Sequence, residues 1–406
     1  MKAIHRYRDM KHRICLGFVA AILGAMAVAG CSDEPTALNS VGNQLLLSHV
    51  TIKTDTLSAV GSSTFKQYVA MDGQVNLVGS SGGYTAYTLI QFFSFYIPER
   101  DTVSVISATL SLLAETWFGD SAGTLSLNVY PINHSWEQST LRWDSVSTDP
   151  GFYDGTSPRG TYTGTVAADS GWMSVSLDTG MVRRWIQPLN YTDNYGIILI
   201  PAQNCTVVRG IHAFGFGVDS LFAHLTVIAR NLAGTVTDTT IYKIGQDTFL
   251  GNIDNLNTNS TLMYAQSGVV YRSTLKFDVS SIPRGSTINE ARLTLRYDPV
   301  SSRITKFVGD TAVAAHLLSD PSDYSKFELT GSRGTGAIAA SDSFGFDLRH
   351  QVQYWIANPG LNYGVLLRAT SVNEFSTFGL FTFYNETVQD PTKRPQLIVK
   401  YAVESN

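Results

Sequence analysis

The chain contains the same unit twice, about 170 residues apart. The first copy runs from Ser174 to Ile200 and the second from Ser343 to Leu367. Each copy reads as a strand ending in an Asp, a short helix ending in Trp-Ile, a polar loop, and an Asn-Tyr-Gly that opens another strand. Solenoid proteins repeat every 20 to 50 residues or so, and this longer spacing therefore predicts a duplicated domain.

The apolar residues of each unit have helical spacing. Val182, Trp185 and Ile186 fall at positions i, i+3 and i+4, which places them on one helix face. Val352, Trp355 and Ile356 repeat this spacing in the second copy. Because a short helix can bury such a face only against a sheet, we expect both tryptophans to lie in a core.

An Asp precedes each of these helices. Asp178 stands before the first helix and Asp347 before the second. A short carboxylate can accept hydrogen bonds from the free amide groups of a helix's first turn. We therefore predict that both residues are N-caps.

The rest of the chain has the period of strands. Leu125, Leu127 and Val129 alternate with polar residues, which is typical of a strand with one solvated face. Short runs of this kind are separated by turn residues throughout, and long helical patterns are absent. The pattern predicts an all-β protein with two tandem jelly-roll-like β-sandwiches, each with one short helix. The predicted domains are residues 46–230 and 241–406, joined by a linker at 231–240.

The N-terminus predicts a membrane anchor rather than part of the fold. Five basic residues precede an apolar stretch from Leu16 to Ala29, which is too short for a comfortable membrane span. The stretch ends in Val28-Ala29-Gly30-Cys31, which resembles the bacterial lipoprotein lipobox. This resemblance implies a signal peptide at residues 1–30, lipidation of Cys31, a tether at residues 31–45, and an address at the outer membrane or cell surface.

The net charge limits the expected partners, and the cysteine content leaves one cysteine besides Cys31 to interpret. Residues 1–30 carry five of the 29 Lys and Arg and one of the 33 Asp and Glu, so the remaining chain has a net charge of −8. This balance disfavours nucleic acid as a partner. Cys205 is the one cysteine left beside Cys31, and we interpret it as a buried small hydrophobic residue.

Several motifs together resemble the DNRLRE-type β-sandwich, a domain of bacterial surface and secreted proteins. The segments that carry the resemblance are Phe277–Pro283, Ala291–Leu295, Trp136–Trp143, the Asp-to-Asn-Tyr-Gly unit, and Arg394–Tyr401. The resemblance covers nearly all of residues 50–402 as two copies, although the literal signature hexapeptide is absent. The resemblance implies a β-sandwich fold. Some domains of this type are similar to polysaccharide-binding modules. The second copy has Asp320–Tyr324 in place of Trp136–Trp143, so the copies need not bind the same ligand.

The sequence shows no catalytic or metal-binding motif. The histidines beyond residue 30 are scattered singly, and no nucleophile elbow or phosphate-binding loop is present. Asp144, Asp149 and Asp154 offer oxygen atoms in one loop and are the candidates for a structural Ca²⁺. We therefore predict no enzyme activity and no cofactor other than this candidate Ca²⁺.

Two features are candidate ligand-binding surfaces. Trp117, with its neighbour Phe118, is predicted to lie between two strands, where an exposed indole can stack on a sugar ring. Four basic residues alternate with apolar ones on two predicted strands and are expected to face solvent as a positive band: Arg272, Lys276, Arg292 and Arg296. Such guanidinium groups pair well with carboxylate or sulfate groups of an acidic polysaccharide.

The favoured interpretation is a membrane-anchored, non-catalytic surface lipoprotein that binds a polysaccharide or cell-wall glycan. One alternative is a structural or adhesive surface protein that binds another protein. The other is a polysaccharide-degrading enzyme whose motifs are not apparent. The sequence leaves the identity of the ligand open.

Overall fold

A computed structural model describes most of the chain beyond residue 49. The described ranges are residues 50–93, 103–166, 170–186, 194–231, 233–253, 259–303, 312–323, 326–327, 332–335, 342–370, 374–375 and 377–404. Within them the chain forms antiparallel sheets with a few short helices, so the all-β prediction is confirmed. Residues 53–401 form one compact unit.

Ten strands form one sheet, which we call the first module together with its helices. The strand order is β11-β10-β4-β9-β2-β3-β8-β5-β6, with β7 paired to β4 and an additional pairing of β11 with β3. The strands are β2 (Val75–Ser81), β3 (Tyr84–Phe92), β4 (Val103–Gly119), β5 (Leu125–Pro131), β6 (Gly160–Gly164), β7 (Gly171–Ser176), β8 (Ile197–Pro201), β9 (Val207–His212), β10 (His224–Asn231) and β11 (Thr237–Ile253). Buried and exposed residues alternate along β4, as its sequence period predicts.

Eight further strands form a sheet that closes on itself in the order β1-β13-β18-β15-β16-β17-β14-β20. We call this closed sheet, with its helix and a small two-stranded sheet, the second module. Its strands are β1 (Val50–Gln67), β13 (Val270–Phe277), β14 (Thr287–Arg296), β15 (Ala312–Leu317), β16 (Ser332–Thr335), β17 (Ser343–Asp347), β18 (Val365–Ala369) and β20 (Gln396–Glu404). The two-stranded sheet pairs β12 (Leu262–Gln266) with β19 (Leu380–Tyr384).

Short helices connect the strands. They are α3 (Trp143–Ser147), α4 (Thr179–Ile186), η3 (Asp219–Leu221), α5 (Arg349–Ala357), η4 (Pro359–Leu361) and η5 (Pro391–Lys393). The two helices that the repeated unit predicts are α4, which packs against β4, and α5, which packs against β14. The sequence did not predict α3, a single turn that begins at Trp143.

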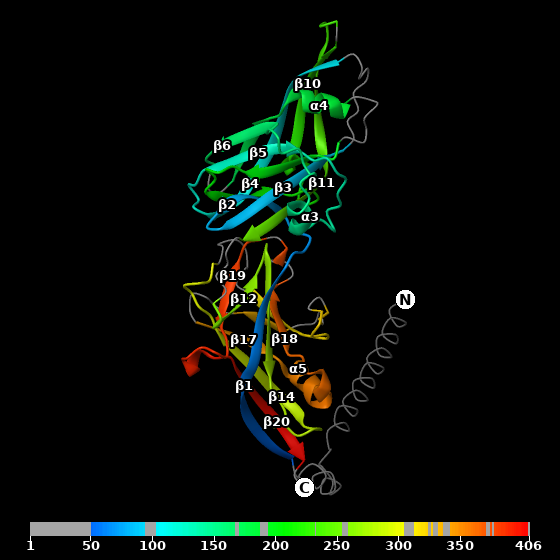
Figure 1. Cartoon of the computed structure of the whole chain (residues 1–406). Coiled ribbons are helices and arrows are strands. Elements are labelled where there is room, and N and C mark those ends of the chain that lie inside the picture. The colour runs from blue at the N-terminus through cyan, green and yellow to red at the C-terminus, as the bar shows by residue number, and fades with distance from the viewer. Residues whose placement is uncertain are drawn as a thin grey trace, which may run out of the picture. The chain divides into compact units, whose positions relative to one another are not determined.

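Strand pairing does not follow the predicted domain boundaries. β1 lies in predicted domain 46–230 but pairs with β13 of the second module, from Ala59 opposite Phe277 to Gln67 opposite Val270. β11 includes part of the predicted linker 231–240 and the start of predicted domain 241–406, but it pairs with β10 and β3 of the first module. Figure 1 shows β1 and β20, the first and last strands within the described residues, side by side. The reason is that a strand pairs with whichever sheet edge satisfies its backbone, and that edge need not be near it in the chain.

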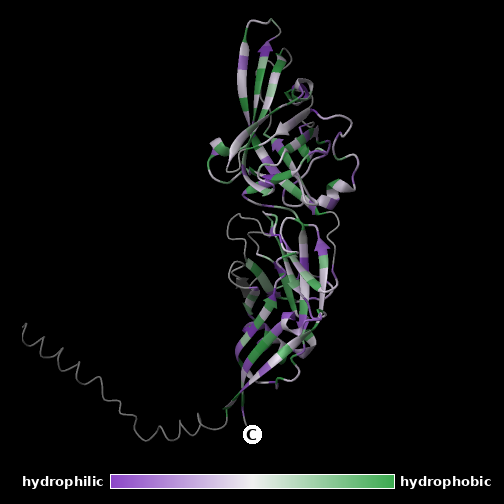
Figure 2. Cartoon of the chain, turned by 90° about the vertical axis from the view of Figure 1, so that its left-hand side faces the viewer, coloured by the Kyte–Doolittle hydropathy of each residue, from purple (hydrophilic) through white to green (hydrophobic). Residues whose placement is uncertain are grey.

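The cores contain the residues that the repeated unit predicts. Trp185 and Trp355 are both buried, and so is Trp136, whose indole nitrogen donates to the Tyr195 carbonyl oxygen at 2.8 Å. Cys205 is buried as well, as predicted. Figure 2 shows the alternation of hydrophilic and hydrophobic residues along the strands that builds these cores.

The two helix N-termini differ. Asp178 directly precedes α4, and its Oδ1 atom accepts a hydrogen bond from the Met181 amide at 2.6 Å, so the predicted cap is confirmed. For Asp347 the prediction holds in part. Leu348 occupies the N-cap position of α5, but the Oδ1 atom of Asp347 accepts a hydrogen bond from the Arg349 amide of the first turn at 3.1 Å. The second copy has one more residue between the Asp and the first buried Val, and this places Asp347 at the end of β17 instead.

The predicted signal peptide, Cys31 and most of the tether lie outside the described residues. Each helix within the described ranges is too short or too polar to span a bilayer.

Candidate functional site

The aromatic candidates do not form an exposed platform. Trp117 and Phe118 lie within β4, which continues to Gly119, so the prediction that they connect two strands is wrong. Both side chains are half-buried: Trp117 packs against the core of the first module, and the Phe118 ring lies 4.8 Å from the ring of Tyr84. The exposed tryptophan is instead Trp172 in β7, at 49% exposure.

The predicted solvent-facing position of Arg272 is also wrong. Its side chain is buried, and its Nε and Nη2 atoms donate to the two carboxylate oxygens of Glu374 at 2.9 and 3.1 Å. Arg368 contacts the same carboxylate from β18. Residue alternation correctly placed Arg272 on the outer face of β13, but Glu374 covers this face at Arg272.

The three other basic candidates lie on two different strands of the second module. Lys276 is exposed on β13, whereas Arg292 and Arg296 share the outer face of β14. In the closed sheet, β1 and β20 lie between β13 and β14, so the four residues do not form one band. Arg296 is paired with Asp342. Arg292 therefore remains as the candidate that defines a site.

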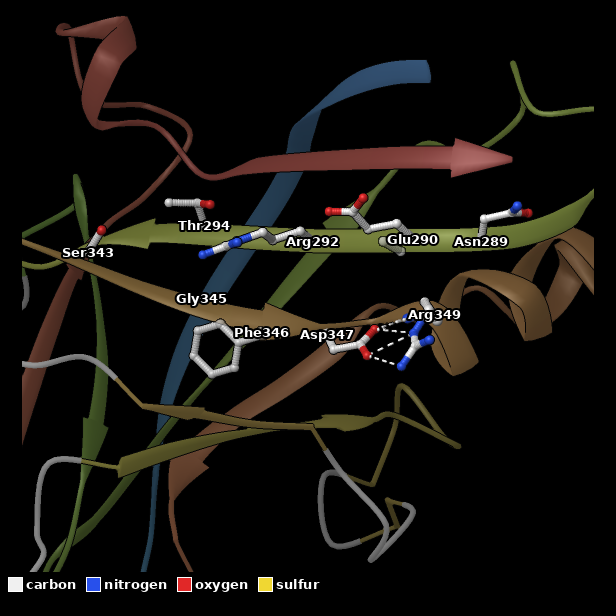
Figure 3. A pocket seen from close by; sticks show the side chains of 10 residues that line it. Asn289, Glu290, Arg292, Thr294, Ser343, Gly345, Phe346, Asp347 and Arg349 are labelled. Atoms are coloured by element: carbon white, nitrogen blue, oxygen red, sulfur yellow. Dashed lines mark hydrogen bonds and ion pairs between the residues drawn. The ribbon is translucent and has the colours of Figure 1, made fainter. Parts of the chain in front are cut away.

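Arg292 lies in an open groove of about 610 Å³ on the outer face of the second module. The groove is formed by β14, β17 and the first residue of α5. The polar side chains that line it include Glu290, Arg292, Thr294, Ser343, Asp347 and Arg349 (Figure 3). Residues 290, 292 and 294 reach the same face because side chains of a strand alternate.

The guanidinium group of Arg292 has no ion-pair partner among the described residues. Asp347 stands directly opposite Arg292 in the pairing of β14 with β17, but its carboxylate binds Arg349 at 2.6 Å. Figure 3 shows the Arg292 side chain extending toward Ser343 and Gly345, away from the Asp347–Arg349 pair. A Cβ atom at Gly345 would lie 3.5 Å from the Arg292 Nη2 atom, so a larger side chain there would occupy the space beside the guanidinium.

The two carboxylates of the groove are neutralised by their own partners. Glu290 accepts a hydrogen bond from the Lys400 ammonium at 2.6 Å, and this bond lowers the pKa of Glu290. The hydrogen bond from the Arg349 side chain lowers the pKa of Asp347 in the same way. Both groups therefore stay ionised at neutral pH and act as hydrogen-bond acceptors rather than as proton donors.

The groove combines one unpaired cation with neutral hydrogen-bonding groups. Two cations, Arg292 and Arg349, and two carboxylates, Glu290 and Asp347, line the groove. Because Asp347 pairs with Arg349 and Glu290 pairs with Lys400 beside the groove, Arg292 is the charge left without an ion pair among the described residues. A guanidinium group presents parallel N–H donors that match a carboxylate or sulfate. The hydroxyls of the groove, at Thr294 and Ser343, can hydrogen-bond to the hydroxyls of a sugar ring.

The equivalent strand positions of the first module, on β4 and β7, carry uncharged side chains. Equivalence follows from one backbone bond, because the Leu177 amide donates to the Ala108 carbonyl oxygen as the Leu348 amide does to that of Ala291. The next residue of β4, Thr109, then stands where β14 has Arg292. The pairing of β4 with β7 places hydroxyl groups and an exposed indole on this face: Thr109 opposite Ser176, Ser111 opposite Ser174, and Leu113 opposite Trp172.

The candidate Ca²⁺ ligands do not converge. Asp144 contacts Arg142 at 3.3 Å, Asp149 contacts His134 at 3.7 Å, and Asp154 contacts Arg159 at 3.3 Å. Within the described ranges, no three His, Cys, Asp or Glu side chains gather in a way that could hold a metal ion.

Sequence reasoning found one of the groove's charged residues and missed the others. Arg292 was identified from strand alternation. Glu290 lies on the same face two residues earlier and carries the same signal, so it could have been found by extending the pattern. Arg349 lines the groove from the start of α5, and Lys400 contacts Glu290 from β20, which the closed sheet places beside β14.

Comparison with known proteins leaves the resemblance untested. No protein-family model matches the chain. No curated protein matches it either.

Proposed function

We propose that this protein is a non-catalytic surface lipoprotein that binds an acidic glycan in the groove around Arg292. The observation that supports the proposal is an open, polar groove whose carboxylates already have partners and whose Arg292 guanidinium forms no ion pair with any residue that the structure describes. An acidic sugar residue would supply the missing partner. The proposal includes the anchor at Cys31, an address at the outer membrane or cell surface, and the DNRLRE-type resemblance.

A polymer fits this groove better than a small enclosed ligand. The groove is open along β14 and β17, so successive sugar residues can extend beyond it. The ionised state of Glu290 and Asp347 also favours binding over cleavage, since glycoside hydrolysis needs one carboxylic acid that holds its proton. Hydrogen bonds to charged groups contribute about 1.5–3 kcal/mol each, which corresponds to a roughly 10- to 100-fold change in affinity.

The test compares two polymers that differ only in charge. The full chain in detergent is titrated with polygalacturonate and with its fully methyl-esterified form in a calorimeter. We expect the acid to bind and Arg292→Ala to weaken that binding at least tenfold, because the ion pair is lost. Arg296→Ala is the matched control on the same face, and it should bind as the wild type does, because Asp342 already engages Arg296.

Two results would overturn the proposal. One is equal affinity for the acid and its methyl ester. The other is an Arg292→Ala variant that binds the acid as tightly as the wild type does.

A further inference from the structure

The outer face of the first module carries ordered rows of polar side chains on β7, β4, β10 and β11. The pairings of these neighbouring strands set side chains opposite one another across the sheet. One row consists of Ser174, Ser111, His224 and Lys243, and the next consists of Ser176, Thr109, Thr226 and Ile241. These side chains point away from the core, because the residue between the two rows is buried on each strand.

An exposed aromatic ring lies at each end of the first row. Trp172 stands two residues before Ser174 on β7 and is 49% exposed. Phe93 follows β3 and is 55% exposed, and its amide donates to the Lys243 carbonyl oxygen at 3.0 Å. The row crosses from β7 to the strand beyond β11, which is roughly 19 Å at the usual spacing of strands.

Both rings are held in place by their neighbours. The His224 ring lies 5.6 Å from the Trp172 ring, and the His224 Nδ1 atom donates to the Phe222 carbonyl oxygen at 3.1 Å. The Phe93 ring packs edge-on against the Phe214 ring at 6.1 Å. Aromatic side chains that are held by packing and still exposed can bind a ligand with little loss of conformational freedom.

The charge on this face is already compensated. The Lys243 ammonium binds the Asp219 carboxylate at 2.7 Å, and neither row contains an Asp, Glu or Arg. An acidic ligand therefore finds no unpaired guanidinium in these rows, unlike in the groove around Arg292. The hydroxyl groups of the rows can both donate to and accept from the hydroxyls of an uncharged sugar.

A protein partner fits this face less well than a sugar does. The core of a protein–protein interface is apolar and its rim is polar. Here the order is reversed, because Ser111 and Thr109 lie in the middle while the exposed rings of Trp172 and Phe93 lie at the ends. A sugar ring has an apolar C–H face that stacks on an aromatic ring, and its hydroxyls surround that face.

We propose that this face binds an extended, uncharged glycan, with one sugar ring stacked on Trp172 and another, farther along the glycan, on Phe93. Sugars with equatorial linkages form such extended chains and leave their C–H faces open. The site is separate from the groove around Arg292, and the inference rests on the proposed function only in taking a glycan as the class of ligand. The two modules then select different sugars, uncharged in the first and acidic in the second.

A crossed comparison of glycans and variants tests the site. The full chain in detergent is titrated in a calorimeter with three uncharged, equatorially linked oligosaccharides, cellohexaose, xylohexaose and chitohexaose, and with polygalacturonate. We expect at least one uncharged oligosaccharide to bind. Trp172→Ala should weaken that binding at least tenfold and Phe93→Ala several-fold, whereas Trp172→Tyr should retain most of it, since a tyrosine ring can still stack.

Arg292→Ala is the control at the other site. It should leave the binding of the uncharged oligosaccharide unchanged, and Trp172→Ala should leave the binding of polygalacturonate unchanged.

Three results would overturn this inference: no binding of any of the three oligosaccharides, binding that Trp172→Ala does not weaken, or binding that Arg292→Ala weakens as much. Polygalacturonate binding that depends on Arg292, without binding of an uncharged oligosaccharide, would refute this site and leave the proposed function standing. The converse pattern would refute the groove and support this site.

Discussion

The two modules build the same strand-helix-strand unit with the same backbone contacts. Gly196 and Gly364 both have a φ of 89°, and a Cβ atom at either position would collide with a backbone carbonyl oxygen of the neighbouring strand. Asn194 and Asn362 both donate from Nδ2 to a carbonyl oxygen of that strand. Close backbone approach therefore fixes the unit in both copies.

The polar side chains on this shared framework differ. The outer face of the first module presents Thr109 and Ser176 where that of the second presents Arg292 and Asp347. The exposed side chains can vary without affecting the core because they alternate with the buried ones. The comparison teaches that the duplicated unit is a scaffold whose outward positions carry different side-chain chemistry in the two modules.

The modules also bury charge in different ways. The second module buries a carboxylate, Glu374, between the guanidinium groups of Arg272 and Arg368. The first module buries Asp247, whose Oδ2 atom accepts a hydrogen bond from the Phe214 amide at 3.0 Å. An ion-paired carboxylate and one without a salt bridge should respond differently to mutation and to pH.

The largest expected effect is on the ion cluster of the second module. Glu374→Gln removes the one carboxylate that compensates Arg272 and Arg368, and it should lower the free energy of unfolding by about 3–5 kcal/mol. Urea denaturation followed by circular dichroism measures the change. Glu290→Gln, in an exposed ion pair, is the control and should have a far smaller effect. Similar losses in both variants would show that burial does not distinguish them.

The next effect concerns Asp247 in the first module. Burial raises the pKa of Asp247 from 3.8 to about 6, so the Asp247 carboxyl group binds its proton more tightly in the folded state than in the unfolded state. The stabilisation from protonated Asp247 has its full value below pH 3.8 and is lost as the pH rises through about 6. The free energy of unfolding changes by about 3 kcal/mol over this range.

Replacement of Asp247 by Asn should remove this pH dependence. The difference in unfolding free energy between wild type and Asp247→Asn, measured from pH 4 to pH 8, is the quantity to follow. We expect the wild type to lose stability relative to the variant as the pH rises. A difference that stays constant over this range would contradict the raised pKa.

The smallest effect separates the two helix N-termini. Asp178→Ala removes the bond to the Met181 amide and should cost about 1 kcal/mol. Asp347→Ala should cost less, because the bonds that Asp347 accepts from the Arg349 amide and side chain are exposed to solvent, whereas the bond of Asp178 is partly buried. Thermal unfolding of the two variants checks the order. Equal losses would mean that Asp347 stabilises its helix as strongly as Asp178 does.

The spacing of residues predicted much of the fold but only part of the candidate site. The helical spacing of Trp185 and Trp355 predicted their burial, and the alternation along β14 predicted that Arg292 faces solvent. The same reasoning failed at Arg272, because alternation identifies the face of a strand and not what covers it. It held only in part at Asp347, because a single extra residue moved the helix start.

Residue pattern alone determined the duplicated unit, the all-β class and the core faces of α4, α5 and β14. These properties depend on spacing within one segment, and period 2 or 3.6 is visible in the residues alone. Only the tertiary structure decided that β1 pairs in the second module and β11 in the first, that Glu374 covers Arg272, and that Lys400 neutralises Glu290 beside Arg292. Each of these contacts joins segments far apart in the chain, and local pattern carries no information about which distant segment meets which.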